Sequence, residues 1–214
     1  LTYAYNKNKI KKISNSLREQ NEKNKSDNGV APLPIYEEGQ SLTALKVVPS
    51  AGIDPVTGQE IFIKRDGSYT FVYDSNDKVI FGDTNPLGTG SITSYLTYKR
   101  FALSCSFLYS FGGSVYNETL ATKVEGANPK YNADERVLND RWKTPGTVAK
   151  YKRIDDTTTP YQTSRFVEKN NFLRMSSLSL SYEVPTNFIQ KYGLKRMFLE
   201  LLTNDLFYLS TAKR

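Results

Sequence analysis

Apolar and polar residues alternate along two stretches near the end of the chain. Residues 178–184 read Leu-Ser-Leu-Ser-Tyr-Glu-Val, which is a strict period of two. In residues 195–201 the apolar positions are Met197, Leu199 and Leu201, and the charged positions on the other face include Arg196 and Glu200. Successive side chains of a β-strand point to opposite sides. The pattern therefore predicts two strands, each with one apolar and one polar face.

A second pair of strands is predicted between residues 91 and 111. Lys99 and Arg100 form a short corner, before which Ile92, Leu96 and Tyr98 share a face with Ser94. After the corner, one face carries Phe101, Leu103, Cys105, Phe107, Tyr109 and Phe111. Leu108 interrupts the opposite, polar face. Residues 1–6 alternate in the same way and predict the last part of another strand.

The corner between the last two predicted strands favours a short helix. Pro185 ends the strand, and Thr186 or Asn187 can cap one or two helical turns. Phe188, Ile189 and Tyr192 form a small apolar face, and Gly193 supplies the C-terminal stop.

Long polar stretches separate these strands, at about residues 7–90 and 112–170. Within the first we expect a short helix around residues 10–18, a Gly-Ile-Asp-Pro turn at residues 52–58 and a hairpin turn at Arg65-Asp66-Gly67. The second shows little strand pattern and predicts a weakly structured segment. Short corners at one end of the strands and long loops at the other are typical of membrane β-barrels. The strand pattern alone also fits a soluble sandwich.

Composition excludes several kinds of chemistry. The 214 residues contain one cysteine, Cys105, and no histidine, so a disulfide within the chain, a zinc cluster and histidine-based catalysis are ruled out. The chain has no run of 18 apolar residues and therefore no transmembrane helix. We find no catalytic constellation, and expect neither an enzyme nor a cofactor.

The net charge of +7 comes largely from the stretch between Lys7 and Lys25. A basic balance can indicate nucleic acid or anionic lipid. This stretch has no aromatic residue on which a base could stack, so we interpret it as a solvated loop and expect no nucleic-acid partner.

Charged residues avoid the apolar faces of the predicted strands, where an Arg or Lys facing lipid would cost about 2–4 kcal/mol near the bilayer centre. Aromatic residues near the strand ends would suit the interfacial girdles of a barrel. They are Tyr98, Phe101, Phe111, Phe172, Tyr182, Phe207 and Tyr208.

The sequence offers four candidate sites. Trp142, beside Arg141, is the candidate substrate contact, where it could stack on a sugar or peptide or pack within its loop. Asp155-Asp156 could be a carboxylate pair, a cation site or part of a solvated loop. Asp54 could bind calcium or cap its own turn. Cys105 lies on an apolar face, which suits a small hydrophobic residue more than a nucleophile. We predict no catalytic, cofactor-binding or metal-binding residue.

Several of these segments resemble the C-terminal part of SusC/RagA-type TonB-dependent outer-membrane transporters. The segments are residues 171–185 and 194–207 (the last two strands), 52–58 (the Gly-Ile-Asp-Pro-Val-Thr-Gly turn), 83–86 with 97–101, and 138–145. They occur in the family's order and cover nearly the whole chain.

The resemblance implies an all-β fold, an antiparallel transmembrane β-barrel fragment with about five spanning strands out of about 22. It also implies uptake of oligosaccharides or oligopeptides across the outer membrane of a Gram-negative bacterium. The implied partners are a SusD-like surface lipoprotein, the TonB complex, the remaining barrel strands with their plug domain, and outer-membrane lipid. On this template residues 1–214 form one C-terminal barrel segment.

The chain departs from that family in lacking a plug domain and a TonB box, and it stops before the family's final strand. Its first residues alternate as they would within a strand, and we expect no signal peptide among them. Open sheet edges are not tolerated in hydrocarbon. We therefore expect a piece of a longer or split barrel that cannot transport alone. The alternative is a soluble all-β carbohydrate-binding or adhesion module.

Overall fold

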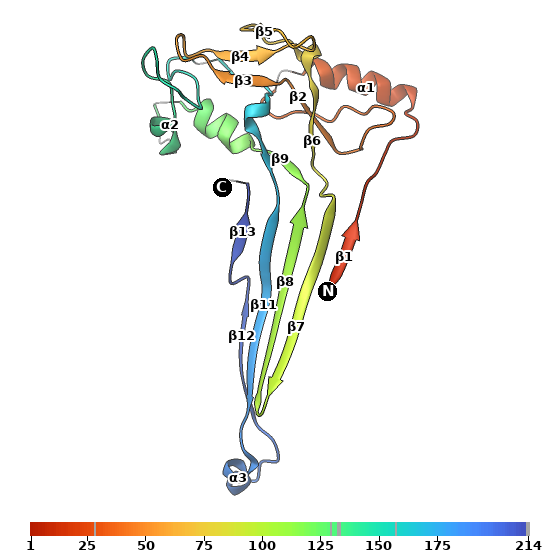
Figure 1. Cartoon of the computed structure of the whole chain (residues 1–214), viewed down its shortest axis with the longest axis vertical. Helices are drawn as coiled ribbons and strands as arrows, with labels where there is room; N and C mark the ends of the chain where they lie inside the picture. Colours follow the sequence, from red (N-terminus) through yellow and green to blue (C-terminus); the bar gives the residue numbers. More distant parts are fainter. Residues whose placement is uncertain (28, 129, 132–133, 157, 213–214) are drawn as a thin grey trace. The chain divides into compact units, whose positions relative to one another are not determined.

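A computed structural model describes residues 1–27, 29–128, 130–131, 134–156 and 158–212. The described chain consists mostly of antiparallel strands with a few short helices, which confirms the all-β expectation (Figure 1). It divides into two compact units. The first, here called the sheet unit, comprises residues 1–6, 86–113 and 169–214, and the second, the loop unit, comprises residues 7–85 and 114–168.

The sheet unit is built on one antiparallel sheet with the strand order β1-β7-β8-β11-β12, and β13 also pairs with β11. The strands are β1 (Thr2–Tyr5), β7 (Gly88–Tyr98), β8 (Phe101–Phe111), β11 (Phe172–Glu183), β12 (Phe198–Asn204) and β13 (Tyr208–Ser210). Short connections join β7 to β8 and β11 to β12. The long connections from β1 to β7 and from β8 to β11 form the loop unit.

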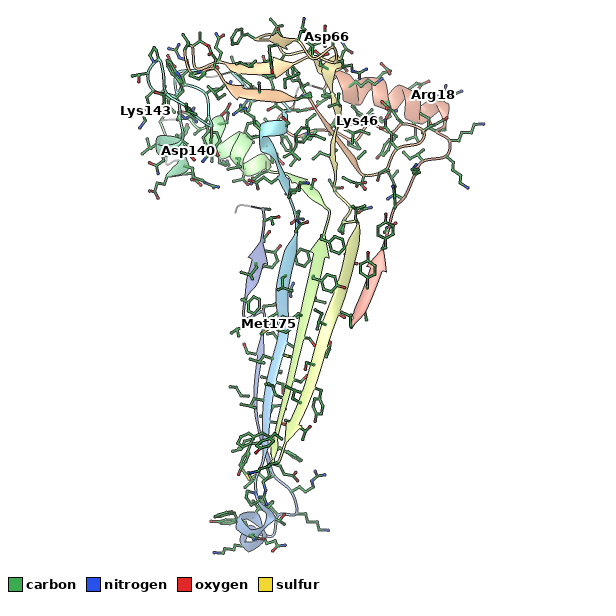
Figure 2. All side chains as sticks on the ribbon, viewed as in Figure 1. Arg18, Lys46, Asp66, Asp140, Lys143 and Met175 are labelled. Atoms are coloured by element: carbon green, nitrogen blue, oxygen red, sulfur yellow. The ribbon has the colours of Figure 1, made fainter. Side chains whose placement is uncertain are left out.

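The strand register confirms the predicted faces. Leu180 lies between Leu103 of β8 and Leu201 of β12, so apolar residues meet across three strands. One residue along, Ser181 pairs with Glu200 on the opposite face. The Ser179 hydroxyl donates to Glu200 Oε1 at 2.6 Å on this polar face. Figure 2 shows the side chains along these strands, with Met175 of β11 labelled.

Aromatic residues occupy both ends of the apolar face. At one end the Phe101 and Tyr182 rings lie 4.7 Å apart, and at the other Tyr3 stacks on Phe111 at 6.3 Å. Phe101 and Phe111 are ten positions apart on β8, which is about 33 Å along a strand and about 25 Å in height at the usual barrel tilt. This height matches the apolar band of outer-membrane barrels, which is about 25 Å tall.

Two of the aromatic residues predicted for these girdles lie on the other face. Phe172 pairs with Ser110 of β8 and stacks on Tyr208 at 5.5 Å, which places both rings on the polar face. Phe207 lies 6.0 Å from Phe107, on the apolar face but away from its ends. A strand-end position in the sequence therefore did not by itself decide the face.

The last predicted strand, at residues 195–201, is shifted in the structure. β12 begins at Phe198 and pairs with β11 up to Asn204, after which Asp205 adopts a left-handed backbone (φ 53°) and β13 resumes the pairing. The register of β11 against β8 slips beside this break, between Met175 and Ser177. A hydrogen bond links the register slip to the left-handed residue: the Asp205 amide donates to the Ser176 carbonyl at 3.4 Å.

The predicted corner helix is present as α3 (Thr186–Ile189) followed by the 3-10 turn η4 (Gln190–Tyr192). Gly193 ends it with φ 73°, as expected for a glycine stop. Neither Thr186 nor Asn187 is the N-cap, which is Pro185 with no side-chain bond. Proline already sets the extended backbone that leads into the first turn.

Gly90 of β7 gives a testable consequence of this sheet. A Cβ at residue 90 would overlap the Thr2 carbonyl and the Tyr109 hydroxyl, which donates to that carbonyl at 2.9 Å. We expect Gly90→Ala to displace β1 and to destabilise the sheet by about 1–3 kcal/mol. Urea unfolding of the protein would measure it, with Thr97→Ala as the control, since Thr97 lies on the same strand beyond the residues that pair with β1.

Among the residues that the structure describes, the loop unit has three small sheets and several short helices. Its strands are β2 (Ala44–Val47), β3 (Ser50–Ile53), β4 (Glu60–Ile63), β5 (Tyr69–Thr70), β6 (Val79–Asp83), β9 (Ser114–Tyr116) and β10 (Val167–Lys169). Its helical segments are α1 (Asn15–Ser26), η1 (Ser75–Asp77), the π-helical η2 (Leu120–Glu125), α2 (Arg136–Asn139) and η3 (Ser164–Phe166). The predicted hairpin turn joins β4 to β5, with Gly67 at φ 84°.

Helix α1 lies further along the chain than the helix predicted at residues 10–18. Ser14 caps it by accepting a hydrogen bond from the Leu17 amide at 3.3 Å. The helix buries amides, not an apolar stripe: Asn21 donates to the Tyr36 carbonyl and Asn24 to the Pro34 carbonyl. Hydrophobic periodicity could not reveal a helix that is anchored in this way.

The segment predicted to be weakly structured, residues 112–169, forms much of a packed core instead. Leu120, Ala121, Val124, Val137, Tyr151 and Phe166 make one buried cluster. Val47, Val48 and Phe62 from the first half of the loop unit are also buried. The prediction failed because the apolar residues of this core stand in short groups that are widely separated along both segments.

Among the described residues, no helix is long and apolar enough to cross a membrane.

Candidate functional site

Trp142, the predicted substrate contact, lies between two turns of the loop unit. Its indole Nε1 donates to the Pro55 carbonyl at 2.8 Å, and its backbone amide donates to the Tyr151 carbonyl at 3.0 Å. A Cβ on Gly58 would come within 2.6 Å of the indole, so the ring packs directly on the backbone of the Asp54–Gly58 turn. The indole therefore packs in part, as one of the two interpretations of the sequence expected, but against a turn from the other half of the loop unit and not within its own loop.

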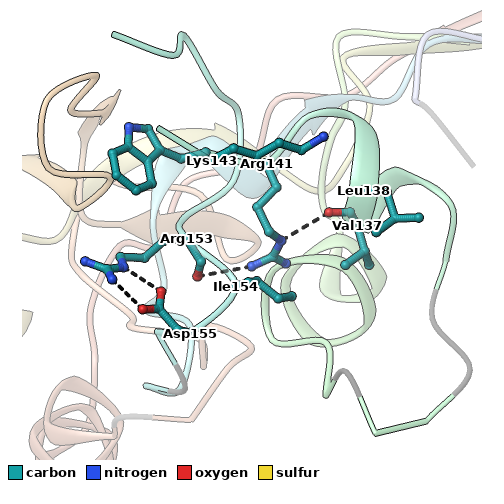
Figure 3. A pocket seen from close by; sticks show the side chains of 8 residues that line it. Val137, Leu138, Arg141, Lys143, Arg153, Ile154 and Asp155 are labelled. Atoms are coloured by element: carbon teal, nitrogen blue, oxygen red, sulfur yellow. Dashed lines mark hydrogen bonds and ion pairs between the residues drawn. The ribbon is translucent and has the colours of Figure 1, made fainter. Parts of the chain in front are cut away.

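The rest of Trp142 borders a cleft of about 460 Å³ (Figure 3). Val137, Leu138 and Ile154 supply its apolar lining. Arg141, Lys143, Arg153 and Asp155 complete it. A concave site with an apolar lining and a few polar groups is the usual form of a small-ligand site. This cleft is the candidate site, and we call it the Trp142 cleft.

The Arg153 and Asp155 side chains form an ion pair beside the cleft. Arg153 Nε donates to Asp155 Oδ1 at 2.5 Å, and Nη2 binds the other carboxylate oxygen. The hydrogen bond from Arg153 lowers the pKa of Asp155. The Arg153 guanidinium also lies 5.8 Å from the Trp142 ring centroid. A ligand in the cleft would meet a partly exposed indole and a fixed pair of opposite charges.

Asp155 and Asp156 do not act together as a carboxylate pair. Asp156 instead lies 3.1 Å from the Lys152 ammonium and accepts from the Thr158 hydroxyl at 2.6 Å. Each carboxylate therefore has its own cation, Arg153 or Lys152. This arrangement stabilises the loop and offers no shared proton.

Arg141 has a structural position at the base of the cleft. Its guanidinium is buried and donates to the carbonyls of Val124, Glu125, Val137, Lys152 and Arg153. Burial lowers the pKa of Arg141, and the nearby Glu125 carboxylate opposes that effect. A guanidinium that satisfies five backbone carbonyls holds three loop segments together and has little capacity left for a ligand.

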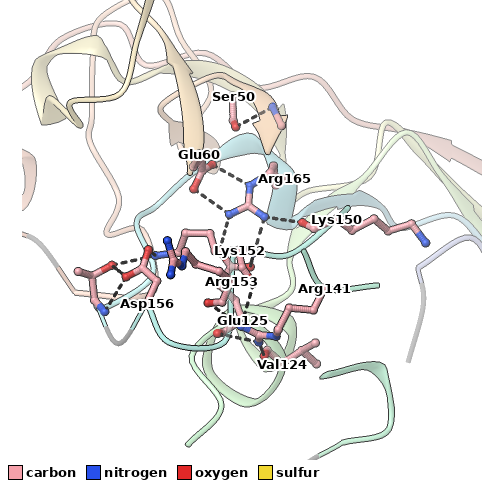
Figure 4. A network of polar contacts seen from close by, with 12 residues as sticks. Ser50, Glu60, Val124, Glu125, Arg141, Lys150, Lys152, Arg153, Asp156 and Arg165 are labelled. Atoms are coloured by element: carbon pink, nitrogen blue, oxygen red, sulfur yellow. Dashed lines mark hydrogen bonds and ion pairs between the residues drawn. The ribbon is translucent and has the colours of Figure 1, made fainter. Parts of the chain in front are cut away.

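A second buried arginine joins the two halves of the loop unit (Figure 4). Arg165 binds both oxygens of Glu60, at 2.8 and 2.7 Å, and reaches Glu125 Oε1 at 2.6 Å. It also donates to the Lys150 carbonyl at 2.6 Å. Burial alone would lower the pKa of Arg165, but the two carboxylates outweigh burial and raise it. We call Arg165, Glu60 and Glu125 the Arg165 cluster. Sequence reasoning missed it, because its members are far apart in the chain.

The remaining candidates have local explanations. The Asp54 carboxylate accepts from the Thr57 hydroxyl at 2.6 Å and from the Val56 and Thr57 amides, which lowers the pKa of Asp54 and matches the turn-capping reading. Cys105 pairs with Leu178 and Ser94 on the apolar face of the sheet. The described part of the chain contains no group of three or more residues that could hold a metal ion.

The sheet and its insertions define a structural class. It is an antiparallel sheet with one apolar and one polar face, whose long connections fold into a separate unit. No protein-family model matches the chain. The chain is 30% identical over 161 residues to TonB-dependent receptor P3 of Formosa agariphila. That match includes 73% of the chain, which spans only 15% of the length of this curated relative.

Solved structures of the RagAB peptide importer share the fold. The open-open state matches 99% of the chain with a TM-score of 0.78 and 19% identity, and the chain covers 23% of that structure's chain. The closed-closed state matches 81% of the chain with a TM-score of 0.68 and 21% identity, and 20% of that chain is covered. The match to a TonB-dependent receptor and the fold shared with these structures support the assignment that the sequence motifs imply, a segment of a SusC/RagA-type TonB-dependent receptor.

Proposed function

We propose that this chain supplies barrel wall and extracellular loops to a TonB-dependent importer in the outer membrane of a Gram-negative bacterium. The sheet unit would provide about five of the roughly 22 strands expected for such a barrel. The loop unit would lie outside the membrane and contact an oligosaccharide or oligopeptide substrate. A SusD-like surface lipoprotein would cover the barrel, and the TonB complex would supply energy through the plug domain.

The observation that carries the proposal is the apolar face of the sheet unit. Large apolar side chains on it remain open to solvent, with Leu201 70% exposed and Leu96 60% exposed. Aromatic rings flank this face at a separation that suits a bilayer. A soluble carbohydrate-binding or adhesion module would have to cover such a face, so this alternative receives no support from the described residues.

Uptake by living cells tests the proposal. A strain that lacks the full-length receptor would be supplied with wild-type receptor, and accumulation of fluorescent oligosaccharides and oligopeptides would be measured with and without the TonB complex. We expect saturable uptake of one of these two classes, and expect it to cease when TonB is removed. Receptor recovered from the soluble fraction, or uptake that continues without TonB, would contradict the proposal.

Trp142 is the residue that we propose for substrate contact. We expect Trp142→Ala to weaken substrate binding by the full-length receptor about tenfold or more, because an aromatic anchor in a cleft is a typical binding hot spot. Trp142→Phe keeps an aromatic ring but loses the indole donor and part of the ring area, so its affinity should fall less than that of Trp142→Ala. Isothermal titration calorimetry with the transported compound would measure both.

Tyr69→Ala is the matched control, since Tyr69 is an aromatic residue of the same unit that is 71% exposed and does not line the Trp142 cleft. Its affinity should stay at the wild-type value. If Trp142→Ala lowered only the stability of the loop unit and left affinity unchanged, Trp142 would be a packing residue alone.

A further inference from the structure

The two short connections of the sheet unit lie at the same end of the sheet. Lys99 and Arg100 join β7 to β8, and residues 184–197 with α3 join β11 to β12 (Figure 1). The Glu183 amide donates to the Arg100 carbonyl at 2.8 Å, and Arg196 Nε donates to Glu183 Oε1 at 3.3 Å. These bonds bring the two connections into one surface, which we call the basic end surface.

Cationic residues dominate this surface. They are Lys99, Arg100, Lys191, Lys195 and Arg196, and all five are exposed. Residues 98–101 and 183–198 contain a single acidic residue, Glu183, which pairs with Arg196. An excess of positive charge therefore remains on exposed side chains of two adjoining connections.

Aromatic residues accompany the cations. Phe188 is 70% exposed and Tyr192 is 81% exposed, whereas Ile189 between them is buried. The Lys99 ammonium lies 5.3 Å from the Tyr98 ring centroid, and the Arg196 guanidinium lies 4.9 Å from that of Phe198. Exposed rings beside flexible cations are the composition that membrane interfaces favour, because rings lie at the headgroup level and cations extend toward phosphates.

The position of these residues along the sheet also favours a membrane interface. Tyr98, Phe101 and Tyr182 end the apolar face at this side, and Lys99, Arg100 and the α3 connection follow directly. In a bilayer that matches the apolar face, these cations lie at headgroup depth.

We infer that the basic end surface binds the phosphodiester headgroups of anionic glycerophospholipids. The inference rests on the proposed function, since it requires the sheet to stand in a membrane. The ammonium and guanidinium groups neutralise the headgroup phosphates of the adjacent leaflet, and Phe188 and Tyr192 insert between the lipids. Cations near an anionic membrane surface each add to the attraction, so several acting together distinguish an anionic lipid from a zwitterionic one.

Native mass spectrometry of the full-length receptor tests this inference. Wild-type receptor in mixed micelles would be titrated with phosphatidylglycerol or with phosphatidylcholine of the same acyl chains. We expect preferential retention of phosphatidylglycerol. Replacing four cations in K99Q/R100Q/K191Q/K195Q should lower its affinity about tenfold or more. Arg196 is kept in this variant because it pairs with Glu183.

The matched control removes four exposed lysines elsewhere, as K7Q/K9Q/K11Q/K12Q, and should retain wild-type lipid binding. Equal phosphatidylglycerol binding by all three proteins, an equal loss in both variants, or displacement of the lipid by inorganic phosphate would overturn the inference. The mobility of unboiled receptor in gels reports barrel folding separately. A receptor that folds and enters bilayers without lipid preference contradicts this inference alone, and one that never enters them contradicts the proposed function as well.

Discussion

Leu178→Arg should lower the free energy of unfolding of the full-length receptor in bilayers by about 2–4 kcal/mol, whereas Ser179→Arg should leave it nearly unchanged. Leu178 pairs with Cys105 on the apolar face, midway between the aromatic rings at its two ends. An arginine facing lipid near the bilayer centre costs about 2–4 kcal/mol. Urea titration of receptor in vesicles, followed by mobility in unboiled gels, would give the difference in folding free energy.

Ser179 is the control because it lies one residue along the same strand and on the opposite face. Its hydroxyl donates to Glu200, so an arginine at this position would meet a carboxylate. Both variants add the same side chain to the same strand, and only the face differs. Equal folding of the two variants would show that the apolar face does not meet lipid. A loss confined to Ser179→Arg would show that the two faces are assigned the wrong way round.

The faces of the long strands could be predicted from the sequence because each strand carries its own alternation. The opposite faces of Leu180 and Ser181 follow from the alternation in their own strand, whatever strand pairs with it. The irregularities could not be predicted in this way. The register slip beside Ser176 and the left-handed Asp205 depend on each other across two strands. Neither segment has a local sequence signal that predicts these two linked irregularities.

The loop unit was the larger failure of prediction, and the reason is physical. Its core and its ion pairs join residues that are distant in sequence, such as Glu60 with Arg165. Isolated apolar and charged residues in polar segments have no period from which a face can be inferred. Trp142 could be singled out as a lone tryptophan, but its Pro55 and Gly58 partners come from the other half of the unit. The sequence identified the residue and could not predict its surroundings.

The second large effect is expected at the Arg165 cluster. The side chains of Arg165, Glu60 and Glu125 are 10%, 3% and 0% exposed. Arg165→Met would leave two buried carboxylates without their cation, and loss of one partner from a buried ion pair typically costs about 3–5 kcal/mol. We expect the loop unit to unfold at much lower urea than in the wild type, which pulse proteolysis of the full-length receptor would show as early cleavage within residues 7–85 or 114–168.

Two further variants separate this explanation from a general effect of losing an arginine. Arg153→Met removes a solvent-exposed ion pair with Asp155 and should change the urea midpoint little, since water already screens those charges. The triple variant E60Q/E125Q/R165M removes the uncompensated negative charges and should recover part of the lost stability, because neutral amides are less costly to bury than carboxylates. If Arg165→Met were as mild as Arg153→Met, the two segments would be joined by their apolar core alone. A triple variant no more stable than Arg165→Met would instead mean that the arginine's hydrogen bonds, and not its charge, hold the loop unit together.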